Sequence, residues 1–467
     1  MTYVRKCPIS RCGHHGRSAV TFGGVPVREA RTLPFLRSLA RHARTPVQAF
    51  EDASNRAGGE LVRLNMGPFR PYLVTHPDHV QHILKTNQPN YVRSGMFWDP
   101  LAPLLGQGIL SDGEGWAASR KILQPVFTAR YLNSLTERMA EIIDRLVETT
   151  VVPGRRFDVA QGISDLIHPT IVRLFLGATI SDSDIERLAP AYDTGVTARS
   201  IRLLLPFAPE RLPLPGDGAF KQAVKTIDEV VYPRIRYARA RGGEAVDLVS
   251  RLVSARRDEA SADRLIRDDM VAIHGAATET SVTALTWVWP VLDAHPQIAA
   301  KVYEEVRRVV GRGPVTVAHL PELTYLKMFV DELVRLYPPG WILPRTAARA
   351  DRIGDTEIAA GSTMVLSPYL THRLPEFWDR PHEFDPERFA PGNERAGHRY
   401  AYFPFAAGPH VCLGPHLFLM EALLLIAGIL CRFRPVLHTT GPVTPRLAST
   451  LRPPAGLSMT LVPVEHA

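Results

Sequence analysis

The sequence predicts a mainly α-helical protein with small β-sheets. Apolar residues recur at helical spacing through most of the middle of the chain and again near its end. Two shorter segments show the alternation typical of strands, one early and one late. Of the 467 residues, 45% are hydrophobic, which is ample for a large core, and we find no internal repeat, low-complexity tract or domain linker.

The first strand pattern covers residues 61–74, and a short helix is expected over 77–84. The second strand pattern covers 358–370, with a turn at Ala360-Gly361, and precedes a proline-rich, charged segment, 375–399, that predicts an ordered loop. Between and after these patterns, helical spacing marks residues 131–149, 163–176, 220–237, 268–292, 296–310, 323–336 and 417–430.

One further segment, residues 203–215, joins two of the predicted helices. It combines four prolines with apolar side chains, which predicts an apolar connection rather than a solvated linker. Such a connection is suited to lining a substrate entrance, and ordinary packing within the core is the alternative.

Charge and cysteine content limit the function classes. The net charge is +8, but lysine and arginine are scattered, which argues against nucleic-acid binding and favours an acidic protein partner. Four cysteines do not make a disulfide framework in a chain of this size, so a reducing cytoplasm is expected. The run Cys7-x-x-x-x-Cys12-x-His14-His15 contains metal-binding residue types but lacks a second ligand pair at the usual spacing, and a poorly ordered terminus is the alternative.

No segment of the sequence predicts a membrane anchor. Residues 1–17 are polar and basic, without an apolar segment of signal-peptide length. The longest apolar stretch, 417–430, carries Glu421 and is shorter than the ~20 residues that a bilayer requires. A buried helix in a soluble protein is therefore expected.

One ten-residue string restricts the function more than any other, the run Phe405-Ala-Ala-Gly408-Pro-His410-Val-Cys412-Leu-Gly414 ahead of the apolar helix. Its residue types suit a loop that holds haem iron through a cysteine thiolate. Its first glycine permits a tight turn or the close approach of a cofactor, and the positive end of the following helix favours a thiolate. The proline after the string suits the first turn of that helix. A buried free cysteine in a loop is the alternative.

This string resembles the cysteine loop of the cytochrome P450 family, Phe-x-x-Gly-x-(Arg or His)-x-Cys-x-Gly, and all five positions match. The resemblance covers about residues 25–463 and implies a single, triangular, mainly helical haem domain at 25–467, after a poorly ordered extension at 1–24. It also implies heme b (iron protoporphyrin IX) as the cofactor. Cys412 would be the iron ligand, with haem contacts from Phe405, His410 and Gly414.

Two further motifs resemble a structural network of the family. Glu332-Leu-Val-Arg335 places opposite charges on one helical face, and Phe384-Asp-Pro-Glu-Arg388-Phe lies further along the chain. Alone, such a charge pair is most often a solvated surface pair. The resemblance implies that Glu332, Arg335 and Arg388 form a buried network that holds the cysteine loop, a structural role that suits a guanidinium fork.

Four positions match contacts of the family with the haem propionates. Trp116 and Arg120 lie on one face of a predicted helix, and Arg345 and His410 match two further positions. Histidine at position 410 replaces the more usual arginine, which makes propionate binding there more sensitive to pH. For Arg120, a solvated helix charge is the alternative.

The segment from Val271 to Ser281 resembles the oxygen-side helix of the family, Ala-Gly-x-(Asp or Glu)-Thr-(Thr or Ser). Glu279 and Thr280 match its acid and its alcohol, which suits delivery of protons to oxygen without flooding the site with water. Ala276 is expected to contact the haem. The alternative for Thr280 is a hydroxyl bonded back to the carbonyl of Ala276.

This helix departs from the family pattern at two positions. The glycine of the family is Ala277 here, which narrows the groove that admits oxygen, although Gly275 supplies flexibility nearby. Pro290 falls late in the helix and is expected to kink or end it, because proline cannot donate to the carbonyl of Thr286. Neither departure removes a chemical group.

An apolar substrate pocket is expected from family position, and its character favours a terpenoid, steroid or macrocycle-like molecule, with a terpenoid first. The residues assigned to it are Phe97, Trp98, Leu204, Phe207, Ile273, Ala277, Trp341 and Ile342.

The sequence therefore predicts a soluble, cytoplasmic, bacterial-type haem-thiolate monooxygenase of secondary metabolism. It would insert one atom of O2 into an apolar small molecule. Because no flavin or iron–sulfur segment is present, electrons are expected from a ferredoxin-type partner with its ferredoxin reductase. A peroxygenase or isomerase, and a haem-dependent sensor or binding protein, are the alternatives; Thr280 and Glu279 argue against the first, because those routes need less proton delivery to dioxygen.

Overall fold

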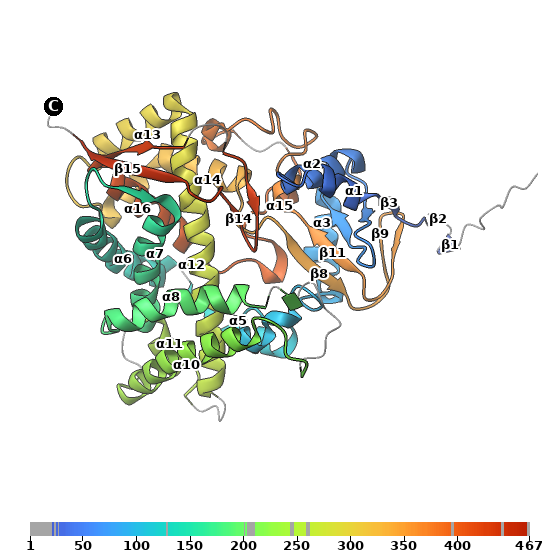
Figure 1. Ribbon diagram of the computed structural model, residues 1–467, viewed down its shortest axis with the longest axis horizontal. Coiled ribbons are helices and arrows are strands. Elements are labelled where there is room, and N and C mark those ends of the chain that lie inside the picture. Colours follow the sequence, from blue (N-terminus) through green and yellow to red (C-terminus); the bar gives the residue numbers. More distant parts are fainter. Residues whose placement is uncertain are drawn as a thin grey trace, which may run out of the picture.

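The computed structural model of the protein places most helices on one side and the largest sheet on the other (Figure 1). It describes residues 21–22, 25–26, 28–127, 129–199, 201–202, 211–242, 247–257, 262–393, 397–439 and 443–464. Residues 1–20, most of the predicted extension, therefore lie outside the described residues, and so do the candidate metal ligands Cys7, Cys12, His14 and His15.

The long helix α12 (Ala262–Ala294) is the axis of the fold. Its 33 residues span about 50 Å at the usual rise per residue. It packs against α7 (Val159–Leu176), α10 (Asp217–Ala240) and α16 (Pro415–Leu430). The sequence predicted that Pro290 would either kink or end this helix. The helix continues past Pro290 to Ala294, so Pro290 does not end it. The reason is that residues 283–292 are buried among neighbouring elements, and this packing outweighs one missing backbone hydrogen bond.

Every long helix expected from the sequence is confirmed, with ends shifted by a few residues. The remaining helices are α1 (Phe35–Arg41), α2 (Pro46–Ala57), α3 (Pro77–Gln81), α4 (Ala102–Leu105), α5 (Gly113–Val126), α6 (Ala129–Thr150), α8 (Asp182–Thr197), α11 (Leu248–Ala255), α13 (Pro296–Val309), α14 (Thr324–Leu336) and α15 (Pro368–Thr371). Helix α8 was not expected. Its sequence signal is a cap, because the hydroxyl of Ser181 accepts a hydrogen bond from the backbone N–H of Asp184.

The largest sheet has six strands in the order β3-β4-β5-β11-β8-β6. They are β3 (Arg31–Leu33), β4 (Val62–Leu64), β5 (Tyr72–Val74), β11 (Thr363–Leu366), β8 (Leu343–Ala347) and β6 (Tyr91–Val92). Strand β11 runs parallel to β5 and antiparallel to β8, so the sheet is mixed. The smaller sheets are β12 (Phe433–Leu437) with β15 (Ser458–Pro463) and β7 (Arg156–Asp158), the pair β9 (Asp351–Ile353) and β10 (Thr356–Ile358), the pair β13 (Arg446–Leu447) and β14 (Leu451–Arg452), and the pair β1 (Thr21–Phe22) and β2 (Val25–Pro26).

The strand pattern over 358–370 is only partly right. The turn falls at residues 360–361, as expected, but the strand after it ends at Leu366. Residues 368–371 form α15 instead, because Pro368 can start a helix and the hydroxyl of Ser367 caps it by accepting from the N–H of Leu370.

Helix α16 is a core helix, as predicted. Within the part of the chain that the structure describes, the stretch Gly408–Leu430 alone is long and apolar enough to cross a membrane, and 67% of its 18-residue apolar window is buried inside the protein. Such burial is what a core helix of a folded domain requires, so this stretch is weak evidence for a membrane span.

Candidate functional site

The cysteine loop is a tight turn that ends at the start of α16. Gly408 has φ of +70°, and a Cβ there would overlap the carbonyl oxygen of Leu84. The backbone N–H of Cys412 donates to the carbonyl of Phe405 at 2.9 Å. The N–H of Gly414 donates to the Cys412 sulfur at 3.3 Å. Glycine is therefore required at position 408, and the loop directs a backbone donor to the sulfur.

The Cys412 thiol is accessible although protein surrounds it closely. Its side chain counts as exposed by surface area, yet burial raises the pKa of the thiol, while the N–H of Gly414 and the charges of Arg120 and Arg93 act to lower it. A sulfur that faces a space inside the protein has both accessible surface and many protein atoms around it, which accounts for the exposure and for the raised pKa. A metal ion there would displace the proton, because a coordinating thiol is deprotonated outright.

His410, Trp116 and Arg120 meet beside this loop. The rings of Trp116 and His410 lie 4.1 Å apart, edge to face. His410 lies 3.3 Å from the carboxylate of Asp112, and burial lowers its pKa although that carboxylate opposes the shift. Arg120, on α5, donates to the carbonyl of Val411 at 2.6 Å, so it is anchored to the cysteine loop rather than solvated at random.

Two further arginines, Arg345, which is buried, and Arg93, which is half-buried, have no close carboxylate partner in the described part of the chain. Arg345, on β8, is 3% exposed and donates to the carbonyl of Pro344 at 2.8 Å. Burial and the charge of Arg93 lower its pKa to about 9. Burial likewise lowers the pKa of Arg93 to about 10, opposed by the carboxylate of Asp112.

Neither Arg345 nor Arg93 has a close ion pair with a carboxylate among the described residues. An anionic group placed between them and His410 would compensate two desolvated cations. The propionates of haem are such groups, and the thiol of Cys412 is the matching iron ligand, so the residues fit haem. Arg93 was missed from the sequence, because it follows a two-residue strand and belongs to none of the motifs used.

On the oxygen side, the hydroxyl of Thr280 donates to the carbonyl of Ala276 at 2.5 Å. This is the back-bonded arrangement that the sequence left as the alternative. Both residues retain accessible surface in the middle of α12, whereas the residues before them, from Val271 to His274, are buried. The hydroxyl is therefore available to a group that offers a better acceptor.

Glu279 is held by the hairpin that β13 and β14 form. One of its oxygens accepts from the hydroxyl of Ser449 at 2.5 Å and from Arg452 at 2.9 Å. Thr450 completes the contact at 3.3 Å. The acid is thus positioned by partners at least 170 residues away in the sequence.

A second carboxyl lies behind the oxygen side. Glu421, on α16, is 1% exposed and accepts from the hydroxyl of Ser281 at 2.5 Å, while its other oxygen has no partner in the described chain. Burial raises its pKa to about 8. Burial thus favours the protonated form of Glu421, and its partner Ser281 directly follows Thr280 in the sequence. The sequence analysis considered Glu421 only as a charge in an apolar stretch.

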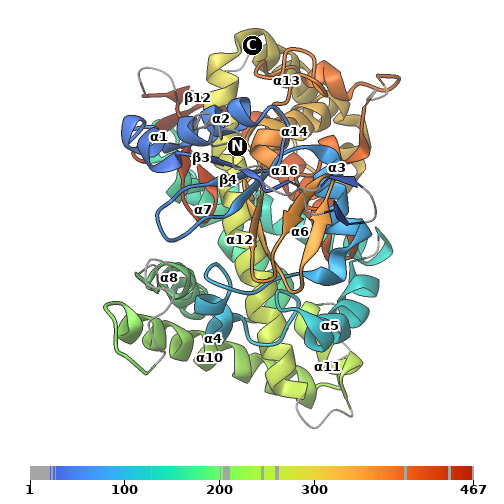
Figure 2. The ribbon, with the colours of Figure 1, turned by 90° about the vertical axis from the view of Figure 1, so that its right-hand side faces the viewer.

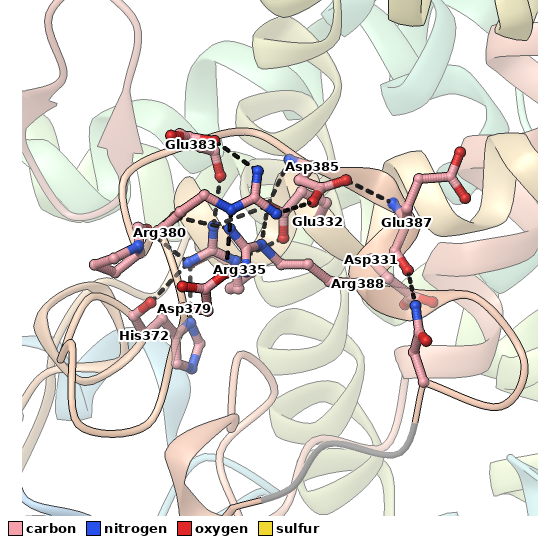
Figure 3. A network of polar contacts seen from close by, with 12 residues as sticks. Asp331, Glu332, Arg335, His372, Asp379, Arg380, Glu383, Asp385, Glu387 and Arg388 are labelled. Atoms are coloured by element: carbon pink, nitrogen blue, oxygen red, sulfur yellow. Dashed lines mark hydrogen bonds and ion pairs between the residues drawn. The ribbon is translucent and has the colours of Figure 1, made fainter.

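The network of Glu332, Arg335 and Arg388 is present and buried (Figure 3). Both side chains of the first pair are 0% exposed, and Arg335 binds both oxygens of Glu332, at 2.6 and 2.8 Å. Arg388 lies 3.4 Å from Glu332. Arg335 also donates to the carbonyls of His372, Pro381 and Glu383.

The same network reaches the cysteine loop through one histidine. One ring nitrogen of His372 lies 3.0 Å from the carbonyl of Arg335, and the other accepts from the N–H of Phe403 at 3.0 Å. The carbonyl of Phe403 accepts from the N–H of Ala406, inside the loop. The network therefore supports the loop from behind.

Some residues assigned to the substrate pocket have a packing role in the structure. Trp341 is 6% exposed, and its ring lies 5.2 Å from that of Phe50. Ile342 packs against the same cluster, and Ile273 is 7% exposed in the main core. An apolar residue type cannot distinguish a pocket wall from a core position, so the sequence could not separate the two.

Three other assignments lie beside β8, against Phe69 and on α12, respectively. The indole N–H of Trp98 donates to the carbonyl of Pro344 at 3.2 Å, next to Arg345. Phe97 lies against Phe69, with 6.1 Å between ring centroids. Ala277 is partly buried on α12. Leu204 and Phe207 lie outside the described residues.

This arrangement fits a haem-thiolate site, and comparison with known proteins identifies the same family. The family model of cytochrome P450 matches residues 28–461. Cyclooctat-9-en-7-ol 5-monooxygenase from Streptomyces melanosporofaciens is 31% identical over 88% of this chain and 90% of its own length. Pentalenene oxygenase from Streptomyces avermitilis is 27% identical over 94% of this chain and 96% of its own length.

Solved structures have the same fold. The crystal structure of the cytochrome P450DA heme domain, in a mutant form, superposes with a TM-score of 0.81 over 94% of this chain and 98% of that chain, at 23% identity. The chain belongs to the cytochrome P450 family. It is a haem-binding monooxygenase that needs O2, a redox partner and a small-molecule substrate.

Proposed function

We propose that this enzyme oxidises a terpenoid in the cytoplasm, with electrons from a ferredoxin and its ferredoxin reductase. Residues 25–467 form the haem domain in this proposal, after an extension at 1–24. The observation that carries it is the cysteine loop, in which a backbone donor and two cations surround an accessible thiol. The curated relatives named above support the substrate class, because two of them oxidise cyclooctat-9-en-7-ol and pentalenene by name.

The residues of the chain divide the work in the following way. When bound, haem supplies the redox chemistry that inserts oxygen into an unactivated bond. Cys412 would ligate the iron as a thiolate, with its charge offset by the N–H of Gly414 and by Arg120. Arg93, Arg345 and His410 would hold the propionates and orient the cofactor.

Protons reach the oxygen side through hydroxyls. Thr280 rotates away from the Ala276 carbonyl and donates into the site, where it also orders a water molecule. Glu421, whose pKa burial raises to about 8, is a second proton carrier, and it accepts a hydrogen bond from Ser281, the residue after Thr280. Glu279, held in place by Arg452, is the other carboxyl group on this side. Such positioned acid assistance contributes typically ~10²- to 10⁴-fold to a rate.

A peroxygenase or isomerase would need less proton delivery to dioxygen, and a haem sensor would need none. The Thr280 hydroxyl and the positioned Glu279 carboxyl therefore favour the monooxygenase that uses O2 and external electrons.

Turnover assays test the proposal directly. Purified holoprotein would be supplied with NAD(P)H, a ferredoxin and a ferredoxin reductase, and separately with hydrogen peroxide alone. Cyclic terpene hydrocarbons and alcohols would be compared with steroids and macrolides as substrates. We expect oxygenated terpenoid product only with the electron-transfer chain. Equal or better turnover with peroxide alone would establish a peroxygenase, and turnover of steroids but not terpenoids would contradict the substrate class.

A further inference from the structure

One hollow in the described part of the chain lies away from the haem site. Its volume is about 160 Å³, and its walls are α6, the loop that follows α7, the end of α10 and the start of α11. Helices α10 and α11 lie near one end of α12 in both views (Figures 1 and 2). The lining shares no residue with the site around Cys412.

Three arginines line this hollow, Arg138 from α6 and Arg234 and Arg241 from α10 and its end. Arg234 donates to the carbonyl of Leu176 at 2.9 Å and to the hydroxyl of Thr179 at 3.0 Å. Arg241 donates to the hydroxyl of Tyr237, at 3.1 Å. None of the three arginines has a carboxylate partner in the described ranges.

The one acid in the lining is already engaged. Asp247 is 8% exposed and its Oδ1 accepts from the backbone N–H of Ser250 at 2.9 Å, which caps α11. Three positive charges and one negative charge leave a formal charge of +2 around the hollow.

Size narrows the class of ligand. The volume of about 160 Å³ equals roughly five times the ~30 Å³ that a water molecule occupies in the liquid. It is smaller than the ~300–1,000 Å³ typical of sites for drug-sized organic ligands. A phosphate group fits this space, whereas a nucleotide would have to extend into solvent.

We propose that this hollow binds an oxyanion of the phosphate class. Arginine forks match the geometry of phosphate oxygens. The hydroxyls of Thr179 and Tyr237 add polar partners at the rim. The anion is either free inorganic phosphate or the terminal group of a small phosphate ester. Binding joins the end of α10 to α6 and α11, so it stabilises the folded holoprotein.

The experiment measures thermal unfolding and binding with holoprotein. Sodium phosphate is compared with sodium chloride at equal ionic strength, and glycerol 3-phosphate tests the ester source. At an anion concentration about tenfold above Kd, we expect the midpoint to rise by roughly 1–2 °C for a chain of this length. Titration calorimetry then gives Kd for each anion.

Two variants test the site, and two matched variants serve as controls. Arg241→Gln and Arg138→Gln should weaken binding at least about tenfold, because each removes a charge-assisted contact. Arg236→Gln on α10 and Arg145→Gln on α6 are exposed and outside the lining, so they should leave Kd unchanged. All four should retain the haem spectrum.

Tighter binding of inorganic phosphate would identify free phosphate as the ligand, and tighter binding of glycerol 3-phosphate would identify an ester. A phosphate effect no larger than that of chloride would overturn the proposal. So would equal phosphate affinity in the Arg241→Gln and Arg236→Gln variants.

Discussion

The two sides of the haem site are built differently. On the cysteine side, Arg335 binds both oxygens of a fully buried carboxylate and three backbone carbonyls. On the oxygen side, the Thr280 hydroxyl bonds only within its own helix, and one oxygen of Glu421 has no partner in the described chain. Satisfied polar groups fix one geometry, whereas unsatisfied ones can exchange partners. This difference supports our proposal that the first side positions the iron ligand and the second side moves protons.

The largest expected effect is on the cysteine side. Glu332→Ala or Arg335→Ala should reduce the free energy of unfolding by ~3–5 kcal/mol and yield little holoprotein, because each leaves a buried charge unpaired. Denaturant unfolding and haem content measure the effect.

A matched pair on the same helix provides the control. Lys327 and Asp331 lie 2.7 Å apart on the exposed face of α14. Lys327→Ala should cost less than ~1 kcal/mol. Wild-type stability in both the Arg335→Ala and Lys327→Ala variants would mean that the Glu332–Arg335 pair contributes no more to stability than an exposed pair. That result would contradict the account of the cysteine side.

The next effect concerns Glu421 and pH. Its folded pKa of about 8 exceeds the usual value of 4.5, so the folded state holds a proton that the unfolded state releases between these values. The stability from this group is full below about pH 4.5 and is lost as pH rises through about 8. Glu421→Gln keeps a neutral side chain, so it should remove this slope and be more stable than wild type above pH 8, by a few kcal/mol at most.

Unfolding by urea from pH 5 to 9 measures this slope. Glu137→Gln, an exposed change on α6, should follow the wild type. If Glu421→Gln and wild type show parallel stability curves, Glu421 is not a protonated buried acid.

A smaller effect is expected for Thr280. Thr280→Ala should keep haem and substrate binding but lower product per NAD(P)H by about tenfold, with hydrogen peroxide released instead. Thr280→Ser should recover much of the coupling. Thr286 makes the same bond to its own helix, at 2.6 Å to the carbonyl of Val282, and Thr286→Ala should leave coupling unchanged. If Thr280→Ala forms as much product per NAD(P)H as wild type, the Thr280 hydroxyl has no role in oxygen activation.

The smallest effect is expected at the hairpin. Arg452 and Glu279 are about one-third exposed, with side-chain values of 34% and 28%. Arg452→Ala should therefore cost less than ~1 kcal/mol and lower coupling by about twofold, with Arg452→Lys intermediate. Arg446→Ala, on the neighbouring strand, is the control. A loss in coupling as large as that of Thr280→Ala would mean that the hairpin, rather than the hydroxyl, governs proton delivery.

The same comparison explains how far the sequence was informative. The cysteine loop and the start of α16 follow from a short local string, since Gly408 and the following proline act through their own backbone. The role of Glu332 and Arg335 needed the family resemblance, because their spacing alone also fits a surface pair. Helix α8 was missed because its signal was the cap at Ser181 rather than a strong apolar period.

Contacts between segments that are distant in the sequence could not be predicted from local sequence patterns. Ser281 and Glu421 are 140 residues apart, and Arg452 and Glu279 are 173 apart, so no periodicity connects them. The role proposed for Arg93 likewise depends on the charges of Arg345 and Asp112 near it, which no local sequence pattern reveals. Trp341 was assigned to the pocket from its family position, and its contact with Phe50 became visible only in the fold.

The central claim is that Cys412 holds the iron as a thiolate. The most direct measurement is the absorption of the reduced carbon monoxide complex in wild type and in Cys412→His, at matched haem content. We expect the red-shifted band of thiolate ligation in the wild type and its complete loss in the variant, because only a thiolate pushes that much electron density onto the iron. Survival of the band in Cys412→His would contradict the assignment and, with it, the account of the site.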